Sequence, residues 1–208
     1  MSRTRVVVLA SGGGTTFENL VERSRDGRLG AEIVKLLVSR PDCGAVERAK
    51  RLRVPFGVVP WTKGEVETFN SVLAGSVDEA KPDLVCLAGF LKLWRIPSRW
   101  TNRVMNIHPA LLPAFGGKGM HGHHVHEAVV ASGAKDSGCT VHLATNEYDA
   151  GPIIVQRTVP VAFEDTADEL ARRVFAAECE AYPEAISLFG AGRLVVDGRR
   201  VRVTSTTA

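Results

Sequence analysis

Continuous apolar runs mark the first half of the chain, at residues 6–10, 33–39 and 84–88. Strands that helices cover on both faces show such runs, whereas half-exposed strands alternate apolar and polar residues. Segments with the helical spacing of apolar residues lie between the runs, at 15–25, 44–52 and 65–80. This repeated strand–loop–helix unit predicts an α/β fold with a doubly wound, mainly parallel sheet and helices on both faces.

The second half of the chain has a less regular pattern. The elements that it predicts are a strand at 103–107, a loop rich in Pro and Gly at 108–122, a helix at 124–131, and strands at 139–144 and 152–161 that flank a loop at 145–151. Asp165 or Thr166 is expected to cap a long helix, which Pro183 should kink or restart. Asp197-Gly198 predicts the turn of a short C-terminal hairpin.

Composition narrows the class of protein. The 208 residues favour a single domain, and 26 basic against 23 acidic residues give a formal charge of +3. So small an excess does not by itself indicate nucleic acid, which is usually bound by a clustered basic face, and it suits a small anionic ligand equally well. No apolar stretch approaches the roughly 18 residues of a membrane span. The four cysteines are widely separated and form no CxxC pair, which is typical of reduced, buried thiols. We therefore expect a cytoplasmic protein.

A glycine-rich turn, Ser11-Gly12-Gly13-Gly14-Thr15-Thr16, directly follows the first predicted strand. Converging backbone N–H groups and the positive end of a helix dipole would accommodate a phosphate there. The turn lacks the Gly-Lys-Ser/Thr ending of a P-loop, and Phe17 stands at the third glycine position of a dinucleotide-binding motif. A phosphomonoester therefore fits better than a dinucleotide, while a turn that needs glycine only for its geometry is the alternative.

Three polar residues are candidates for acid–base chemistry. Asn106 and His108 lie two residues apart in an extended segment and so share one face, where an amide donor and an imidazole suit an oxyanion and a proton transfer. Asp149 lies in a later loop, and a carboxylate beside His108 would raise the pKa of the imidazole and favour its protonated form. Local hydrogen bonding at a strand end, and a turn-forming Asp, are the alternative interpretations.

Four of the six histidines cluster at His121, His123, His124 and His126. A metal site is one interpretation, but no cysteine lies nearby and Glu127 is the single adjacent carboxylate. Helix entry and surface roles fit this segment better, so no metal is expected.

Taken together, these segments resemble the phosphoribosylglycinamide formyltransferases, folate-dependent enzymes of purine synthesis. The resemblance spans residues 5–196 and rests on the glycine turn, on Leu87-Ala-Gly-Phe-Leu91, on Asn106-Ile-His-Pro-Ala-Leu-Leu-Pro113, and on Gly138-Cys-Thr-Val-His142 followed by Asp149-Ala-Gly-Pro-Ile-Ile154. It implies the Rossmann-like formyltransferase fold in a single domain, with a phosphate-binding half at about 1–103 and a catalytic and folate half at about 104–203. A homodimer is possible.

The resemblance also implies roles for individual residues. Asn106, His108 and Asp149 match the catalytic residues of the family. The positions expected to bind the ribonucleotide substrate are Gly13, Gly14, Thr15, Thr16, Gly89, Pro109 and Glu178. The positions expected to bind the co-substrate 10-formyltetrahydrofolate are Leu91, Lys92, Leu93, Trp94, Asn106, Thr145, Asn146, Glu147, Tyr148 and Asp149.

The implied reaction transfers the formyl group from 10-formyltetrahydrofolate to the amine of 5'-phosphoribosylglycinamide. No Ser or Cys is placed as an activated nucleophile, so a direct transfer is expected, with Asn106 and a protonated His108 stabilising the oxyanion. Two departures from the family bear on affinity for the folate tail: a longer loop at 114–120, and Val66 where a basic residue is common.

Other members of the formyltransferase superfamily are alternatives. A methionyl-tRNA formyltransferase would carry a further C-terminal domain after Val203, and a formyltetrahydrofolate deformylase would carry an N-terminal regulatory domain before the strand that begins near Arg5. We therefore expect neither. A non-catalytic nucleotide-binding module is an alternative of a different class, which would bind ligand without turnover.

Overall fold

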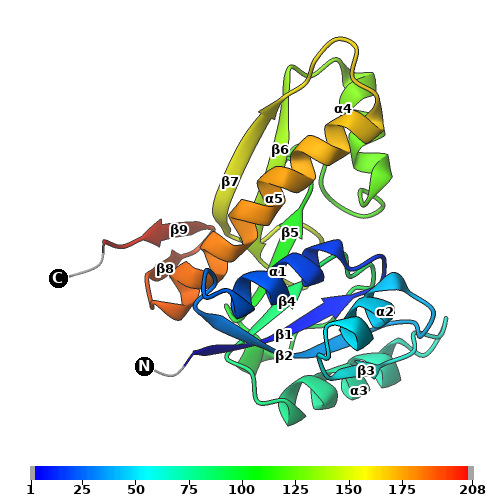
Figure 1. The fold of residues 1–208 in the computed structure, drawn as a ribbon, viewed down its shortest axis with the longest axis vertical. Coiled ribbons are helices and arrows are strands. Elements are labelled where there is room, and N and C mark those ends of the chain that lie inside the picture. The colour runs from blue at the N-terminus through cyan, green and yellow to red at the C-terminus, as the bar shows by residue number, and fades with distance from the viewer. Residues whose placement is uncertain (1–2, 206–208) are drawn as a thin grey trace. The chain divides into compact units, whose positions relative to one another are not determined.

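The first of two units in the computed structural model is built on a parallel sheet (Figure 1). The structure describes residues 3–205, and the boundary between the units falls between Met105 and Asn106. Within the first unit the strands are β1 (Thr4–Ala10), β2 (Ala31–Val38), β3 (Phe56–Val58) and β4 (Leu84–Leu87), in the order β3-β2-β1-β4. All three pairings in this order are parallel. The predicted parallel sheet is thus confirmed, although the sequence patterns did not reveal β3.

Helices cover this sheet on both faces. They are α1 (Thr15–Arg25), α2 (Gly44–Arg51) and α3 (Val66–Glu79), and the short 3-10 helix η1 (Ser98–Trp100) follows β4. Helices α1 and α2 contact each other, so they lie on one face, and the right-handed crossover from β3 back to β4 places α3 on the other. Residues 6–10 of β1 are fully buried, as the continuous apolar run predicts.

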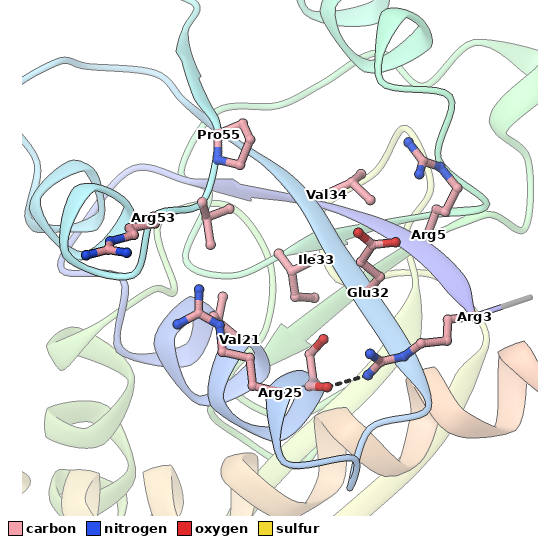
Figure 2. A pocket seen from close by; sticks show the side chains of 11 residues that line it. Arg3, Arg5, Val21, Arg25, Glu32, Ile33, Val34, Arg53 and Pro55 are labelled. Carbon is pink, nitrogen blue, oxygen red and sulfur yellow. Dashed lines mark hydrogen bonds between the residues drawn. The ribbon is translucent and has the colours of Figure 1, made fainter.

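Arginine side chains cap the carboxyl ends of these helices. Arg3 donates to the carbonyl of Ser24 in the last turn of α1, Arg25 donates to that of Leu52 after α2, and Arg5 donates to Ala80 and Lys81 after α3, at 2.9 and 3.1 Å. These guanidiniums, with Arg53 and Glu32, line a cavity of about 470 Å³ over a floor that includes Val21 and Ile33 (Figure 2). Cations at the negative end of a helix dipole are stabilising, so the cluster of positive charge has a structural explanation.

The second unit combines a mixed sheet with a long helix. Its elements are β5 (Val104–His108), which begins two residues before the unit boundary, α4 (His123–Ser132), β6 (Asp136–Leu143), β7 (Ile153–Pro160), α5 (Ala167–Gly190), β8 (Leu194–Asp197) and β9 (Arg200–Val203). Strands β6, β7, β9 and β8 are neighbours in that order; β6–β7 and β8–β9 are antiparallel, and β9 adds to β7 in parallel. Helix α5 packs on β6 and β7. The predicted C-terminal hairpin is therefore confirmed.

Helix α5 differs from its sequence-based prediction at Pro183. Thr166, rather than Asp165, is the N-cap, and it forms a capping box with Glu169. Pro183, however, does not restart the helix, because α5 runs unbroken from Ala167 to Gly190. Its neighbours Tyr182, Ala185 and Ile186 are fully buried, and this packing outweighs the hydrogen bond that proline cannot donate. Over residues 3–205, no helix is both long and apolar enough to cross a bilayer.

Lys81 offers a test of local backbone strain. It follows α3 in the left-handed region, with φ 47°, where a Cβ is unfavourable and glycine is common. We expect Lys81→Gly to raise the free energy of unfolding by about 1 kcal/mol, measured by urea denaturation. The matched control is Ser71→Gly at an exposed position inside the same helix, which should lower it by about 0.5 kcal/mol. A loss of stability in Lys81→Gly would contradict the strain.

Candidate active site

Asp149 lies at the centre of the polar cluster in the second unit. Its Oδ1 accepts from Nδ2 of Asn106 at 3.3 Å, its Oδ2 accepts from the backbone N–H of Gly117 at 2.9 Å, and Nδ1 of His108 lies 3.6 Å from Oδ2. The side chains of His108 and Asp149 are only 4% and 10% exposed. Strand β5 presents Asn106 and His108 on one face, so the structure brings together all three predicted catalytic residues.

His142 is a fourth member that the sequence analysis did not assign to the site. Its Nδ1 lies 3.0 Å from the carbonyl of Leu143, which only accepts, so Nδ1 carries a hydrogen. Nε2 lies 3.1 Å from Nδ2 of Asn106 and accepts from it, and it is 3.6 Å from Oδ1 of Asp149. The His142 ring therefore fixes which way the Asn106 amide points. Its position at the end of β6, directly before the loop that carries Asp149, was the available signal.

The loop that carries Asp149 is closed tightly at its base. The N–H of Leu143 donates to the carbonyl of Pro152 at 2.9 Å, and a Cβ on Gly151 would lie 1.6 Å from the carbonyl oxygen of Leu143. Only glycine fits at this close approach. Asp149 itself has φ 54°, in the left-handed region that Asp tolerates better than most residues with a side chain. The closed base of the loop and the residue type thus both favour the observed position of Asp149.

The segment after β5 completes the surroundings of His108. The carbonyl of Phe115, another residue with positive φ (53°), accepts from Nε2 of His108 at 2.8 Å. Residues 110–112 are tied to β6 because the buried Thr140 hydroxyl donates to the carbonyl of Ala110 and accepts from the N–H of Leu112. Gln156 on β7 donates to the carbonyl of Leu112 at 3.0 Å. Thr140, Gln156 and the Phe115 carbonyl are contributions that the sequence analysis missed.

The protonation of His108 differs from the sequence-based expectation. Burial lowers the pKa of His108 below its ordinary value, and this effect outweighs the raising effects of the Asp149 charge and the Phe115 carbonyl. The expectation of a protonated His108 was therefore wrong, although Asp149 does raise the pKa of His108 as expected. Burial also opposes ionisation of Asp149, but the neighbouring His142 and His108 side chains and the hydrogen bond from the Gly117 N–H together hold the pKa of Asp149 below its usual range.

The glycine turn lies in the first unit, between β1 and α1. Gly14 is the N-cap of α1 with φ 83°, and no side chain caps the helix, so the amide groups of its first turn have no side-chain acceptor. A Cβ on Gly14 would lie 2.7 Å from Cα of Ala45 at the start of α2, whereas a Cβ on Gly13 would meet nothing within 4 Å. Gly13 and Thr15 are exposed, and Thr16 is half-buried. The predicted phosphate-binding residues thus form one continuous turn.

Ser11 connects the glycine turn with the segment after β4. Its N–H donates to the carbonyl of Gly89 at 3.0 Å, and its hydroxyl accepts from the N–H of Leu91 at 3.1 Å and bonds Ser39 at 2.8 Å. Gly89 and Leu91, predicted to contact the two substrates, are therefore held beside the end of β1. From the sequence, Ser11 was predicted only as part of the turn.

The remaining predicted positions have different environments. Trp94 is buried, and its indole N–H has no hydrogen-bond partner in the described structure. Lys92 places its Nζ 3.9 Å from the centre of the Trp61 ring, while Leu91 and Leu93 are exposed. Residues 145–148 (Thr145, Asn146, Glu147 and Tyr148) are exposed, Pro109 is half-buried, and burial raises the pKa of Glu178 on α5 to about 8.

Two histidines at the start of α4 lie beside carboxylates. His123 lies near Glu127 and Asp168, at 3.5 and 3.6 Å, and His124 lies 3.1 Å from Glu127. His126 is buried, and burial lowers its pKa. Within residues 3–205, no three or more His, Cys, Asp or Glu side chains are grouped as metal ligands would be.

The chain is similar to known proteins over most of its length. Residues 4–186 match the family described as formyl transferase. The chain belongs to the formyl transferase family. A glycinamide ribonucleotide transformylase from Symbiobacterium toebii is 39% identical, with a TM-score of 0.90 over 98% of this chain and 95% of that one. A phosphoribosylglycinamide formyltransferase from Coxiella burnetii is 32% identical, with a TM-score of 0.86 over 97% and 94% of the two chains.

Curated relatives agree with the predicted resemblance. A chloroplastic phosphoribosylglycinamide formyltransferase from Vigna unguiculata is 39% identical over 93% of this formyl transferase chain. The chain spans 63% of the length of that relative and 64% of a similar protein from Arabidopsis thaliana. A formyltetrahydrofolate deformylase from Pseudomonas syringae pv. tomato, at 23% identity and a TM-score of 0.88, shares the fold. The formyltransferase fold is therefore confirmed.

The coupling of His108 to Asp149 is directly testable. Because the Asp149 charge raises the pKa of His108, we expect Asp149→Asn to lower that pKa further, as measured by NMR titration of the imidazole. Glu147→Gln, at an exposed position of the same loop, is the control and should leave it unchanged. An unchanged pKa in Asp149→Asn would disprove the coupling.

The depressed pKa of His108 also sets the sign of its pH effect on stability. The unfolded chain binds the proton more readily, so the contribution of His108 is complete above about pH 6.5 and is lost as the pH falls through the folded-state pKa. Asp149→Asn increases the difference between the pKa values of His108 in the folded and the unfolded chain. Its free energy of unfolding should therefore fall more steeply than that of the parent between about pH 6.5 and pH 4, above the range in which the parent also loses the contribution of Asp149.

Proposed function

We propose that this formyl transferase moves the formyl group of 10-formyltetrahydrofolate to the amine of 5'-phosphoribosylglycinamide, giving the N-formyl product and tetrahydrofolate in de novo purine biosynthesis. The observation that carries the proposal is the buried cluster of Asn106, His108 and Asp149, with two of the three groups at 10% exposure or less. The similar enzymes, a phosphoribosylglycinamide formyltransferase and a glycinamide ribonucleotide transformylase, support the choice of amine substrate.

The acid–base cluster suits a direct acyl transfer. The amine attacks the formyl carbon, and the carbonyl oxygen becomes an oxyanion to which Nδ2 of Asn106 donates. The 3.3 Å hydrogen bond from Asn106 to Asp149 is the longer of its two and is the one that the oxyanion would replace. His108, neutral at rest, accepts the proton that the attacking amine releases, and the imidazolium that forms is stabilised by the Asp149 carboxylate. The proton then passes to the departing folate nitrogen.

Ribonucleotide binding is assigned to two groups of residues. Gly13, Gly14, Thr15 and Thr16 bind the phosphate through backbone N–H groups, hydroxyls and the amino end of α1. Gly89, Pro109 and Glu178 contact the rest of the ribonucleotide. Burial raises the pKa of Glu178 to about 8, which favours a protonated carboxyl group that both donates a hydrogen bond to a ribose hydroxyl and accepts one from it.

Folate binding is assigned to two segments and the catalytic residues. The first segment is 91–94, where the unpartnered indole N–H of Trp94 offers a donor. The second is 145–149, which ends on Asp149. The reduced folate is the co-substrate in this proposal, and no metal takes part. Small molecules are the partners; a cytoplasmic location, a single functional domain and a possible homodimer stay predictions.

The decisive experiment follows tetrahydrofolate formation from 10-formyltetrahydrofolate, with and without 5'-phosphoribosylglycinamide. We expect turnover only when the ribonucleotide is present, together with one N-formyl product for each tetrahydrofolate. Turnover independent of the ribonucleotide would instead indicate a deformylase. Binding of the ribonucleotide with no turnover would indicate a non-catalytic module.

Asn106→Ala tests the role of the amide. Since the amide is assigned to the oxyanion, we expect kcat to fall by about 10²–10³ while the Kd of the ribonucleotide changes little. Steady-state kinetics and calorimetric titration of the ribonucleotide give the two quantities. A kcat within twofold of the parent would remove Asn106 from the mechanism.

Two alanine substitutions in the glycine turn separate binding from folding. A Cβ at Gly13 meets no protein atom within 4 Å, so Gly13→Ala should keep the parent melting temperature but raise the KM for the ribonucleotide, since the methyl group obstructs the phosphate. Gly14→Ala adds a Cβ at positive φ, 2.7 Å from Ala45, and should lower the melting temperature. An unchanged ribonucleotide KM in Gly13→Ala would place the phosphate elsewhere.

A further inference from the structure

The carbonyl groups of the glycine turn face α2. The N–H of Ala45 donates to the carbonyl of Gly12 at 3.1 Å, and Nη1 of Arg48 donates to the carbonyl of Gly13 at 2.7 Å. The first of these contacts is made by backbone at the start of the helix. The second depends on one side chain, one turn further along α2.

Peptide geometry converts these contacts into a direction for the N–H groups. In a planar trans peptide the C=O of one residue and the N–H of the next point to opposite sides. Fixing the carbonyls of Gly12 and Gly13 against α2 therefore directs the N–H groups of Gly13 and Gly14 away from α2. These are two of the amides assigned to the phosphate.

The peptide between Gly13 and Gly14 has little intrinsic resistance to rotation. Glycine on both sides means that no Cβ opposes a flip of this peptide unit. After a flip, the N–H of Gly14 would point toward α2 and a carbonyl oxygen would face the phosphate. An anchor on the Gly13 carbonyl is thus the contact that keeps the turn in its anion-binding arrangement.

Arg48 is itself held in position. Its Nε donates to Oε2 of Glu18 in the first turn of α1 at 2.7 Å, and Arg51 pairs with the other oxygen of the same carboxylate. The hydrogen bond from Arg51, opposed by burial and assisted by Arg48, lowers the pKa of Glu18, so this anchor is ionised at neutral pH. The Arg48 side chain is 29% exposed, which leaves it partly shielded from water.

We propose that Arg48 is a positioning residue for substrate binding: it holds the Gly13 carbonyl so that the Gly14 N–H faces the phosphate of the ribonucleotide. The inference rests on the proposed function of the glycine turn. It assigns to α2, which the sequence analysis treated only as a structural helix, a part in the affinity for phosphate. Arg51, which shares Glu18 but not the Gly13 carbonyl, has no such part.

The test compares Arg48→Met with the matched control Arg51→Met. Each variant removes one guanidinium from Glu18, but only Arg48→Met frees the Gly13 carbonyl. For Arg48→Met we expect a KM for the ribonucleotide raised about tenfold, because a hydrogen bond from a charged donor is lost. Its KM for 10-formyltetrahydrofolate and its kcat at saturation should stay within twofold of the parent. Arg51→Met should stay within twofold in all three constants.

A second variant and a second measurement keep the proposal falsifiable. Arg48→Lys retains a charged donor for the Gly13 carbonyl and should recover part of the lost affinity, and circular dichroism checks that each variant melts as the parent does. Titration with inorganic phosphate, followed by calorimetry, measures the turn without any formyl transfer. We expect the Kd for phosphate to rise in Arg48→Met and not in Arg51→Met.

The outcomes separate this inference from the proposed function. A parent that binds phosphate but transfers no formyl group would refute the proposed function, while the loss of phosphate binding in Arg48→Met would still support the role of Arg48. An active parent whose ribonucleotide KM and phosphate Kd are unchanged in Arg48→Met, or changed equally in Arg51→Met, would overturn the role of Arg48. No phosphate binding by the parent would overturn it as well.

Discussion

A nearly buried carboxylate is the constraint on which the polar cluster of the second unit depends. The Asp149 side chain is 10% exposed, and a charge removed from water needs compensating donors or cations. It receives hydrogen bonds from Asn106 on β5 and from Gly117 in the loop after β5, and His108 and His142 lie 3.6 Å away. Because these groups come from separate segments, satisfying one carboxylate fixes the positions of all of them.

Burial of the cluster also determines the charge of the His108 imidazole. A site dry enough to strengthen the hydrogen bonds of an oxyanion also disfavours a charged imidazole, and here the burial outweighs the nearby carboxylate. The imidazole is neutral at rest, yet its two ring nitrogens lie near the Phe115 carbonyl and the Asp149 carboxylate, which are the acceptors that an imidazolium needs. Such a group is suited to accept a proton during a reaction rather than to hold one beforehand.

Neighbouring elements constrain the backbone geometry of the candidate site in both units. In the second unit, Phe115 adopts a left-handed conformation that is strained for its residue type, Asp149 adopts one that Asp tolerates, and hydrogen bonds to the Phe115 carbonyl and the Asp149 carboxylate hold both residues in place. In the first unit, glycines make the turn after β1 adaptable, and contacts from α2 with the carbonyls of Gly12 and Gly13 select one arrangement. In each case hydrogen bonds with a neighbouring segment determine the direction of a polar group.

Local patterns in the sequence determined the elements and part of the site. Apolar runs specified the main strands of the first unit, and the spacing of Asn106 and His108 placed both on one face of β5, because strand side chains alternate. The three-residue strand β3 was too short to give a pattern, and the effect of Pro183 depended on the packing of α5. Only the tertiary structure brought Asp149 to Asn106 across 43 residues, assigned His142 and Phe115 to the site, and attached Arg48 to Gly13. It also reversed the expected protonation of His108, because a pKa depends on burial, and burial is a property of the folded chain.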